Sequence, residues 1–391
     1  MSKILYLYDN NMPTVSMMKE ELNRDKADYP YESEIASVRE VNTEQLNNAD
    51  VIVLVRPTEY LSHSIAKWSR KRDKFLVVFC DDDLYNGVQD SLINKSRVKF
   101  FRKTIVLADL LWTCSPRIAE KYRDLVRMKQ CLVTNTIVEP DDIYPHNGGN
   151  EKVKIVYAAG AGHSSLFEKN ISPIVQKLYD SLGRIFTVTF VGVRPDVPVS
   201  AENRDLISYL PFMSLEEYRS FMRDENFDIG VAPLNTDEFS KCKYFNKFFE
   251  YAMFGIAGLY SNTEPYTYVI SDKENGLLVK NGPDNWYNAI REAIEDQNLR
   301  NRISLHSQQT LRDRFYPEAN DNEIRQFIPV KVDSDNKPIV GDFQLNASRL
   351  IYVVYSNYLY GITALEHLVS EGPVALFRKI VDHKKNKKTF G

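Results

Sequence analysis

The segment KCKYFNKFFEYAMFGIAGLYSN, residues 241–262, decides the fold that this sequence predicts. Its apolar and aromatic residues have the density of a buried helix that runs into a buried strand, and Gly255 stands between them as a helix C-cap would. The charged residues Lys243, Lys247 and Glu250 interrupt it. On a helix of about 3.6 residues per turn, this spacing places all of them on one face. We therefore expect a buried helix with one charged stripe.

The surrounding residues continue this alternation of apolar strand and amphipathic helix. Strands are predicted at 153–160, 186–192, 227–234, 256–262 and 275–281. Helices are predicted at 166–182, 214–224, 283–295 and 297–313. Strands that alternate with helices pair in parallel, so this half of the chain predicts a doubly wound sheet.

The first 135 residues repeat the pattern. Strands that lack a polar face are predicted at 3–8, 50–55, 74–80 and 130–135, and helices at 12–27, 59–73, 92–108 and 115–127. The stretch 138–152 is rich in Pro, Gly, Asn and Asp and reads as a linker. The predicted fold is α/β, with two doubly wound Rossmann-like domains facing a cleft. Their boundaries are 1–140 and 151–315, and 316–391 is an extension for which a return to the first domain is one hypothesis.

Composition narrows the class of protein. A chain of 391 residues is too long for one ordinary core. Its 50 basic and 53 acidic residues leave a net charge of −3, which gives no general attraction to nucleic acid. The sequence has no apolar run of membrane-spanning or signal-peptide length. Its 4 cysteines show no zinc-type spacing, so we expect reduced thiols in a cytoplasmic protein.

The charged stripe has two interpretations. It is a solvated face with one ion pair worth a few tenths of a kcal/mol, or it is a polar strip that contacts an anionic ligand. In the second case the lysines neutralise phosphate, and the carboxylate accepts two hydrogen bonds from a vicinal diol. Burial of a carboxylate among aromatic residues is costly unless it is paired or faces a wet cleft. Spacing alone does not separate these interpretations.

The stretch 243–290 resembles the C-terminal domain of retaining GT-B glycosyltransferases of the group 1, family 4 type. The resemblance is in the order of features: DIGVAPL, then a K-x-x-x-K-x-x-E helix and a glycine, then EPY, NGLLV, a helix with a tryptophan, and LRNRI. It covers most of 151–313. The first half is similar to part of the same family through VRP, which contains Arg56, and through VVFCDDDLY, ADLLWTCSPRIAEKY and VTNTI.

The resemblance assigns roles to the stripe. It implies that Glu250 binds the ribose hydroxyls of a nucleotide-sugar donor, and that Lys243 and Lys247 lie against the diphosphate or the transferred sugar. Asn246 lies in the same segment, and we expect it to contact the donor as well. The stripe would then be the donor site.

Further donor contacts are implied outside this helix. YAAGAGH would supply Gly160 and Gly162 for close approach of the backbone to phosphates. His163 would contact phosphate or sugar, although a capping or core histidine fits as well. Phe212 falls where the family holds the nucleobase, and plain packing is the alternative.

The sequence also departs from the family. Where the family often has a second glutamate, eight residues before Glu250, this chain has Cys242. YDNNMPT replaces the usual glycine pair after the first strand. These departures leave the identity of the donor sugar undetermined. They also favour an alternative, a catalytically inactive GT-B protein that serves as partner or stabiliser of another transferase. A nucleotide-sugar isomerase on the same fold is a third interpretation.

The aspartates of VVFCDDDLY, Asp81 to Asp83, end a buried strand. They are a metal-binding motif of the GT-A type, an acceptor-orienting group in a metal-free enzyme, or a solvated turn. The second Rossmann-like domain favours the metal-free form, in which lysines and helix N-termini neutralise the diphosphate. Asp82 and Asp83 are therefore the acceptor-side candidates, and we expect no metal and no cofactor.

The expected activity is transfer of a sugar from a nucleoside-diphosphate sugar to a glycan or lipid-linked acceptor. Retention of configuration, independence of metal and a role in bacterial cell-surface polysaccharide synthesis are implied by the resemblance. The expected catalytic residues are Asp82, Asp83, Lys243 and Lys247. The basic tail FRKIVDHKKNKK, 377–388, suggests peripheral contact with the inner face of the plasma membrane as a hypothesis.

Overall fold

The structure is a computed structural model that describes residues 1–22, 30–87, 89–146, 148–160, 164–329 and 345–363. The chain divides into two compact units. The first unit contains Met1–Thr134 together with the residues from Asp321 on, and the second contains Asn135–Asn320. The stretch 138–146, in which the composition predicts the start of a linker, therefore belongs to the second unit.

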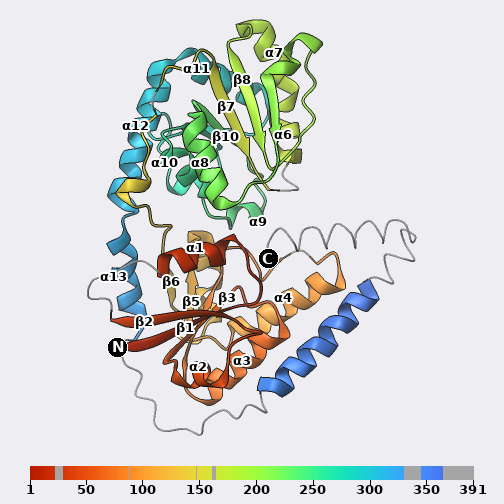
Figure 1. The fold of residues 1–391 in the computed structure, drawn as a ribbon, viewed down its shortest axis with the longest axis vertical. Helices are drawn as coiled ribbons and strands as arrows, with labels where there is room; N and C mark the ends of the chain where they lie inside the picture. Colours follow the sequence, from red (N-terminus) through yellow and green to blue (C-terminus); the bar gives the residue numbers. More distant parts are fainter. Residues whose placement is uncertain (23–29, 88, 147, 161–163, 330–344, 364–391) are drawn as a thin grey trace. The chain divides into compact units, whose positions relative to one another are not determined.

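The first unit is built on a parallel six-stranded sheet with the strand order β2-β1-β3-β4-β5-β6 (Figure 1). The strands are β1 (Ser2–Tyr8), β2 (Tyr31–Ser37), β3 (Val51–Val55), β4 (Phe75–Phe79), β5 (Leu110–Thr113) and β6 (Cys131–Val133). The helices are α1 (Pro13–Leu22), α2 (Thr43–Asn48), α3 (Tyr60–Lys71), α4 (Leu92–Ile105), α5 (Pro116–Tyr122) and most of α13 (Pro317–Phe327), and residues 345–363 are also helical.

The second unit repeats this design with the strand order β12-β11-β10-β7-β8-β9, again all parallel. Its strands are β7 (Val153–Ala158), β8 (Phe186–Val191), β9 (Ile207–Leu210), β10 (Ile229–Ala232), β11 (Ala257–Ser261) and β12 (Leu277–Val279). Its helices are α6 (Ser164–Asn170), α7 (Ser172–Leu182), α8 (Leu215–Glu225), α9 (Glu238–Lys241), α10 (Asn246–Met253), α11 (Pro283–Glu295) and α12 (Gln297–Arg314).

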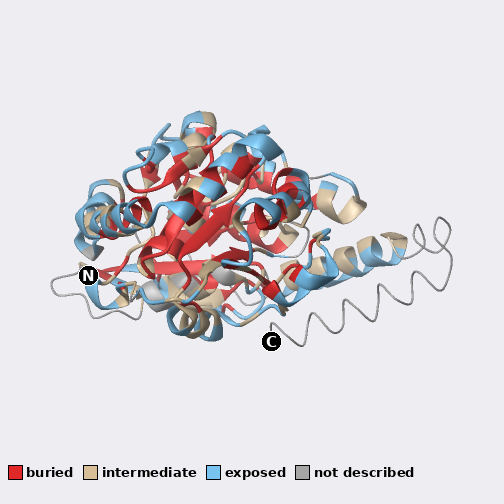
Figure 2. Ribbon diagram, turned by 90° about the horizontal axis from the view of Figure 1, so that it is seen from above, coloured by how far each residue is buried: buried red, intermediate tan, exposed pale blue. Residues whose placement is uncertain are grey.

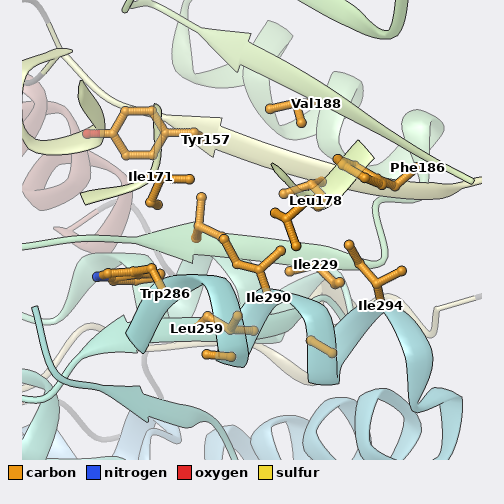
Figure 3. Close-up of a cluster of buried hydrophobic side chains, with 14 of the residues drawn as sticks. Tyr157, Ile171, Leu178, Phe186, Val188, Ile229, Leu259, Trp286, Ile290 and Ile294 are labelled. Carbon is orange, nitrogen blue, oxygen red and sulfur yellow. The ribbon is translucent and has the colours of Figure 1, made fainter. Parts of the chain in front are cut away.

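The core of the second unit shows why these residues form these elements. Trp286, Ile290 and Ile294 line one side of α11 and are almost fully buried. Figure 3 shows them facing the sheet beside Ile229 of β10. Phe186 begins β8 and is fully buried. Burial coloured on the ribbon in Figure 2 shows the strands as the buried layer and the outer sides of the helices as the exposed one. This pattern fits strands that lack a polar face.

Some elements differ from the sequence prediction. The predicted helix 166–182 is two helices, α6 and α7, because Pro173 lies in the first turn of α7 and provides no backbone N–H for a longer helix. The strands β2, β5 and β9 were not predicted. β2 is an edge strand with the polar sequence YESEIAS, and β5 and β9 have only 4 residues each. Residues 350–363, part of the predicted extension, are helical.

Each sheet has one point where the chain reverses the direction in which it adds strands. In the first unit this point lies between β1 and β3, and in the second unit between β7 and β10. Open parallel sheets bind ligands at the carboxyl ends of the strands beside this point. Within the described residues no helix has the length and apolar character that crossing a bilayer requires.

Candidate functional site

The predicted charged stripe is only partly present. The helix α10 begins at Asn246, so Lys247 and Glu250 share it, whereas Lys243 lies in the turn that follows α9. The prediction that one helix carries all the charges is therefore wrong for Lys243. The chain turns there because Tyr244 and Phe245 are buried and their rings contact each other at 4.2 Å between centroids. The Lys243 ammonium instead lies 5.5 Å from the centroid of the Phe239 ring.

Glu250 is half-buried and has one carboxylate oxygen uncommitted. Its Oε2 accepts a hydrogen bond from the Tyr218 hydroxyl at 3.0 Å. The same oxygen forms an ion pair with the ammonium group of Lys247, three residues before Glu250. Its Oε1 accepts a hydrogen bond from none of the described residues. The Lys247 ammonium also lies 5.8 Å from the centroid of the Tyr218 ring. Glu250 is thus held in place through one oxygen while the other is available to a ligand.

The tyrosine beside Glu250 stays protonated. Burial raises the pKa of Tyr218 well above its ordinary value, and the negative charge of Glu250 raises it further. A neutral phenol that donates to a carboxylate is the stable arrangement, because a phenolate there would repel Glu250. Tyr218 comes from α8, so this hydrogen bond also joins α8 to α10.

The next residue along α10 fixes the helix on the sheet. The Tyr251 hydroxyl donates a 2.9 Å hydrogen bond to the Val231 carbonyl of β10. Its ring lies so close to β10 that a Cβ atom at Gly230 would approach it to 2.6 Å. Gly230 is therefore required for this contact, and the contact holds α10, the helix that contains Glu250, against the strand at which the sheet reverses its order.

The other predicted donor-side residues lie in loops of the same unit. Gly160 is exposed after β7, and a Cβ atom there would meet no described atom within 4 Å. Phe212, after β9, is 57% exposed, and its ring lies near Gly192. Asn246 is exposed at the start of α10. Gly162 and His163 lie outside the described residues.

Cys242 occupies the position where the resembled family often has a glutamate. It is fully buried, and its backbone N–H donates to the carbonyl of Glu238, the first residue of α9. This departure from the family therefore leaves Glu250 without a second glutamate at the family's usual position.

In the first unit, the aspartates after β4 are neutralised by basic side chains of the chain itself. Arg56 forms ion pairs with Asp81 and with Asp82, the latter at 2.9 Å. The Thr14 hydroxyl also donates to Asp81 at 2.6 Å. Arg56 follows β3 and has a φ of 50°, a backbone conformation uncommon for residues other than glycine. Asp82 is the most exposed of this group, which keeps it a candidate for contact with an acceptor.

Asp83 has a different environment. It is buried, and it accepts hydrogen bonds from Tyr122, from the Lys121 ammonium at 3.0 Å and from the Asn86 backbone N–H at 3.0 Å. Burial acts to raise its pKa, but the hydrogen bonds from Tyr122 and Lys121 hold the pKa below its ordinary value. These contacts favour a structural role, in which Asp83 fixes the turn that presents Asp82.

Sequence reasoning missed Asp9. It follows β1 within YDNNMPT, is buried, and accepts hydrogen bonds from the backbone N–H groups of Thr58 at 2.6 Å and Glu59 at 3.0 Å and from the Ser62 hydroxyl. Burial first, and then the charge of Glu59, raise the pKa of Asp9 to about 7. Glu59 is itself paired with Arg39 at 3.0 Å. A carboxylate directly after a largely apolar strand is the signal that would have identified it.

The described residues include no group of three or more His, Cys, Asp or Glu side chains placed to hold a metal ion. Independence of metal stays a prediction, because this observation concerns only part of the chain. The cysteines in the described part are free thiols, and Cys80 is fully buried.

No family model and no curated protein matches this chain in sequence. Solved structures do match its fold. HepE of Anabaena in complex with UDP-glucose is 13% identical with a TM-score of 0.59, over 83% of this chain and 99% of that one. Sucrose-phosphate synthase of Thermosynechococcus elongatus is 11% identical with a TM-score of 0.57, over 83% and 98%.

A third solved structure with a similar fold is named for an epimerase activity rather than for glycosyl transfer. A putative UDP-N-acetylglucosamine 2-epimerase of Listeria monocytogenes is 11% identical with a TM-score of 0.53, over 86% of this chain and 99% of that one. At such identities the likeness concerns the fold alone. The predicted fold class is confirmed: the chain has the two-unit α/β fold of the GT-B type, with a parallel six-stranded sheet in each unit.

Proposed function

We propose that this protein is a glycosyltransferase that binds a nucleoside-diphosphate sugar in its second unit. The observation that carries the proposal is the geometry of Glu250, whose Oε2 is held by Tyr218 and Lys247 while its Oε1 is uncommitted. A carboxylate so held can accept both hydroxyls of a ribose. Support comes from the attachment of its helix to β10 and from the GT-B fold, on which HepE of Anabaena binds UDP-glucose.

The basic side chains near Glu250 would neutralise the diphosphate. Lys247 keeps its ion pair with Glu250 and has further N–H groups that donate to the phosphate oxygens, and Lys243 approaches from the turn before α10. Charge that develops on the leaving diphosphate is then stabilised without a metal ion. Gly160 admits the phosphates close to the backbone, and Phe212 stacks on the base.

The finer assignments follow the family resemblance. The transferred group is of the hexose type, the reaction retains the anomeric configuration, and the acceptor is a glycan or a lipid-linked glycan in bacterial cell-surface polysaccharide synthesis. The reaction takes place in the cytoplasm. In the first unit, Asp82 orients the acceptor hydroxyl while Asp83 supports the turn.

The test is thermal melting against UDP-, GDP-, TDP- and CMP-sugars. A ligand at 100 times its dissociation constant stabilises the unit that binds it by about 2.7 kcal/mol, which raises the melting temperature by a few degrees. We expect a rise with one nucleotide class that is absent in Glu250→Ala. Glu292→Ala is the matched control, because Glu292 pairs with Lys273 on the surface of the same unit. An equal rise in Glu250→Ala would remove Glu250 from the site.

Two alternatives each have one observation in their favour. The burial of Cys242 favours an inactive protein that stabilises another transferase, and that protein would show no rise with any nucleotide sugar. The likeness to the putative 2-epimerase favours an isomerase. Incubation of the donor without acceptor separates the isomerase, since only an isomerase converts the donor to another nucleotide sugar.

A further inference from the structure

The helix at 345–363 packs against the first unit through one side. The Tyr352 hydroxyl accepts a hydrogen bond from Arg39 at 2.7 Å, and the Tyr355 hydroxyl lies 3.1 Å from that of Ser96. The Tyr355 ring packs edge-on to Phe100 at 5.8 Å between centroids. Figure 1 draws this helix in blue beside α4, in agreement with these contacts. Its inner side is therefore attached to α4 and to the loop that contains Arg39.

The outer side of this helix is apolar and exposed. Leu350, Val354 and Tyr358 follow at intervals of four residues, so they lie on one face, and they are 66%, 63% and 62% exposed. Ile351 and Tyr360 are exposed as well. The stretch 350–363, LIYVVYSNYLYGIT, contains no charged residue. Clustered exposed apolar side chains of this kind mark a surface that binds another molecule or a membrane.

The neighbouring helix α4 is basic along its whole length. Its charged residues are all lysine or arginine and all are exposed: Lys95, Arg97, Lys99, Arg102 and Lys103. Arg97 lines a groove with Tyr352, Tyr355 and Tyr360, which places the charge directly beside the apolar helix. The nearby acidic groups are engaged within the chain, since Asp90 accepts from Asn94 and Glu59 pairs with Arg39.

The buried His63 lies near basic groups of two helices. Burial, and then the charges of Lys67 and Lys103, lower the pKa of His63 to about 4. Lys67 belongs to α3 and Lys103 to α4, so both helices contribute basic groups to this side of the unit.

We propose that the outer side of the 345–363 helix, together with α4, binds an anionic lipid bilayer. Leucine, valine and tyrosine side chains enter the boundary between headgroups and acyl chains, while lysine and arginine attract the anionic headgroups. A second copy of the chain fits this surface less well. In a two-fold dimer through this helix, the two basic α4 helices would approach each other without compensating acidic groups.

This inference does not depend on the proposed function, because it uses no residue of the donor site. The residues that follow the helix, 364–391, contain more basic than acidic side chains and so have the same sign of charge as α4. The basic tail at 377–388 lies outside the described residues, and the proposal rests on the described helices alone.

The test is flotation of the full chain with lipid vesicles. We expect binding to phosphatidylcholine vesicles with about 30% phosphatidylglycerol, little binding to phosphatidylcholine alone, and loss of binding at about 0.5 M salt, where charges are screened within a few ångströms. Val354→Ser with Tyr358→Ser removes apolar contacts, and Lys95→Glu with Lys99→Glu reverses charge. Each pair should weaken binding by about 10-fold or more.

Matched controls separate this surface from general charge effects. Lys169→Glu with Arg312→Glu makes the same change in net charge on exposed residues of the second unit and should bind like the parent. Because the substituted residues are exposed, thermal melting should show all variants folded. Equal binding of the parent to neutral and anionic vesicles would overturn the proposal. Unchanged vesicle binding in both double variants would overturn it as well. So would concentration-dependent self-association of the parent that only Val354→Ser with Tyr358→Ser abolishes.

Discussion

The substitution Asp9→Asn tests which force dominates at the end of β1. Burial and the nearby charge of Glu59 raise the pKa of Asp9 from 3.8 to about 7, although hydrogen bonds from Thr58, Glu59 and Ser62 act in the opposite direction. The native state then keeps a proton on Asp9 at pH values where the unfolded chain has lost it. The stability that this proton contributes is fully present below about pH 4 and is lost as the pH rises through about 7.

The magnitude follows from the shift in pKa. The difference between 7 and 3.8 is about 3 pKa units, and each unit corresponds to about 1.4 kcal/mol, so the whole effect is about 4 kcal/mol. Between pH 5 and pH 7 about half of it should appear, roughly 2 to 3 kcal/mol. Asparagine does not titrate. The difference in unfolding free energy between parent and variant should therefore change by this amount, with the parent losing stability relative to the variant as the pH rises.

The measurement is urea unfolding at intervals from pH 5 to pH 8. The two units can unfold separately, so the signal must come from the first one. In a Trp286→Phe background the remaining tryptophans, Trp68 and Trp112, both belong to the first unit. Asp124→Asn, on an exposed residue of that unit, is the control and should show no such trend. A difference that is constant with pH, or that changes in the opposite direction, would show that the hydrogen bonds outweigh burial and would refute the reasoning.

Two further predictions concern the placement of Glu250. Tyr218→Phe removes the 3.0 Å hydrogen bond to Glu250 and should weaken nucleotide-sugar binding by about 10- to 150-fold, the range for a hydrogen bond to a charged group. A calorimetric titration that finds parental affinity would contradict this. Gly230→Ala brings a Cβ atom within 2.6 Å of the Tyr251 ring and should destabilise the second unit by about 1–3 kcal/mol in urea unfolding. Gly160→Ala, with open space around its Cβ atom, should unfold like the parent, and similar unfolding of both alanine variants would show that the close contact is unimportant.

The candidate site shows where sequence reasoning succeeds and where it stops. Glu250 was found because a carboxylate inside an aromatic helix requires a partner or a ligand, a constraint that acts over a few neighbouring residues. The hydrogen bond from Tyr218 could not be predicted, since Tyr218 lies on a different helix, 32 residues earlier in the chain. The stripe was assigned one residue too many because helical spacing says nothing of where a helix begins. Burial of Tyr244 and Phe245 decides that Lys243 lies in a turn.

In the first unit, too, the sequence predicts that charged groups need partners but not which residues supply them. Three adjacent aspartates predict a need for cations, and the structure supplies Arg56 for Asp81 and Asp82 and Lys121 for Asp83. Those basic groups come from other elements, after β3 and within α5. Their assignment, and with it the separate environments of Asp82 and Asp83, depends on which strands and helices are neighbours in space.

The sequence by itself determined the fold class, because the alternation of apolar runs with amphipathic ones depends on local periodicity and is readable without contacts. It also determined which helix carries the candidate carboxylate. The tertiary structure alone decided which charges are neutralised within the chain, which carboxylate oxygen is uncommitted, and that the 345–363 helix has an apolar outer side beside a basic α4. These properties depend on burial and on distances between residues far apart in the sequence. Such contacts form only when the chain has folded.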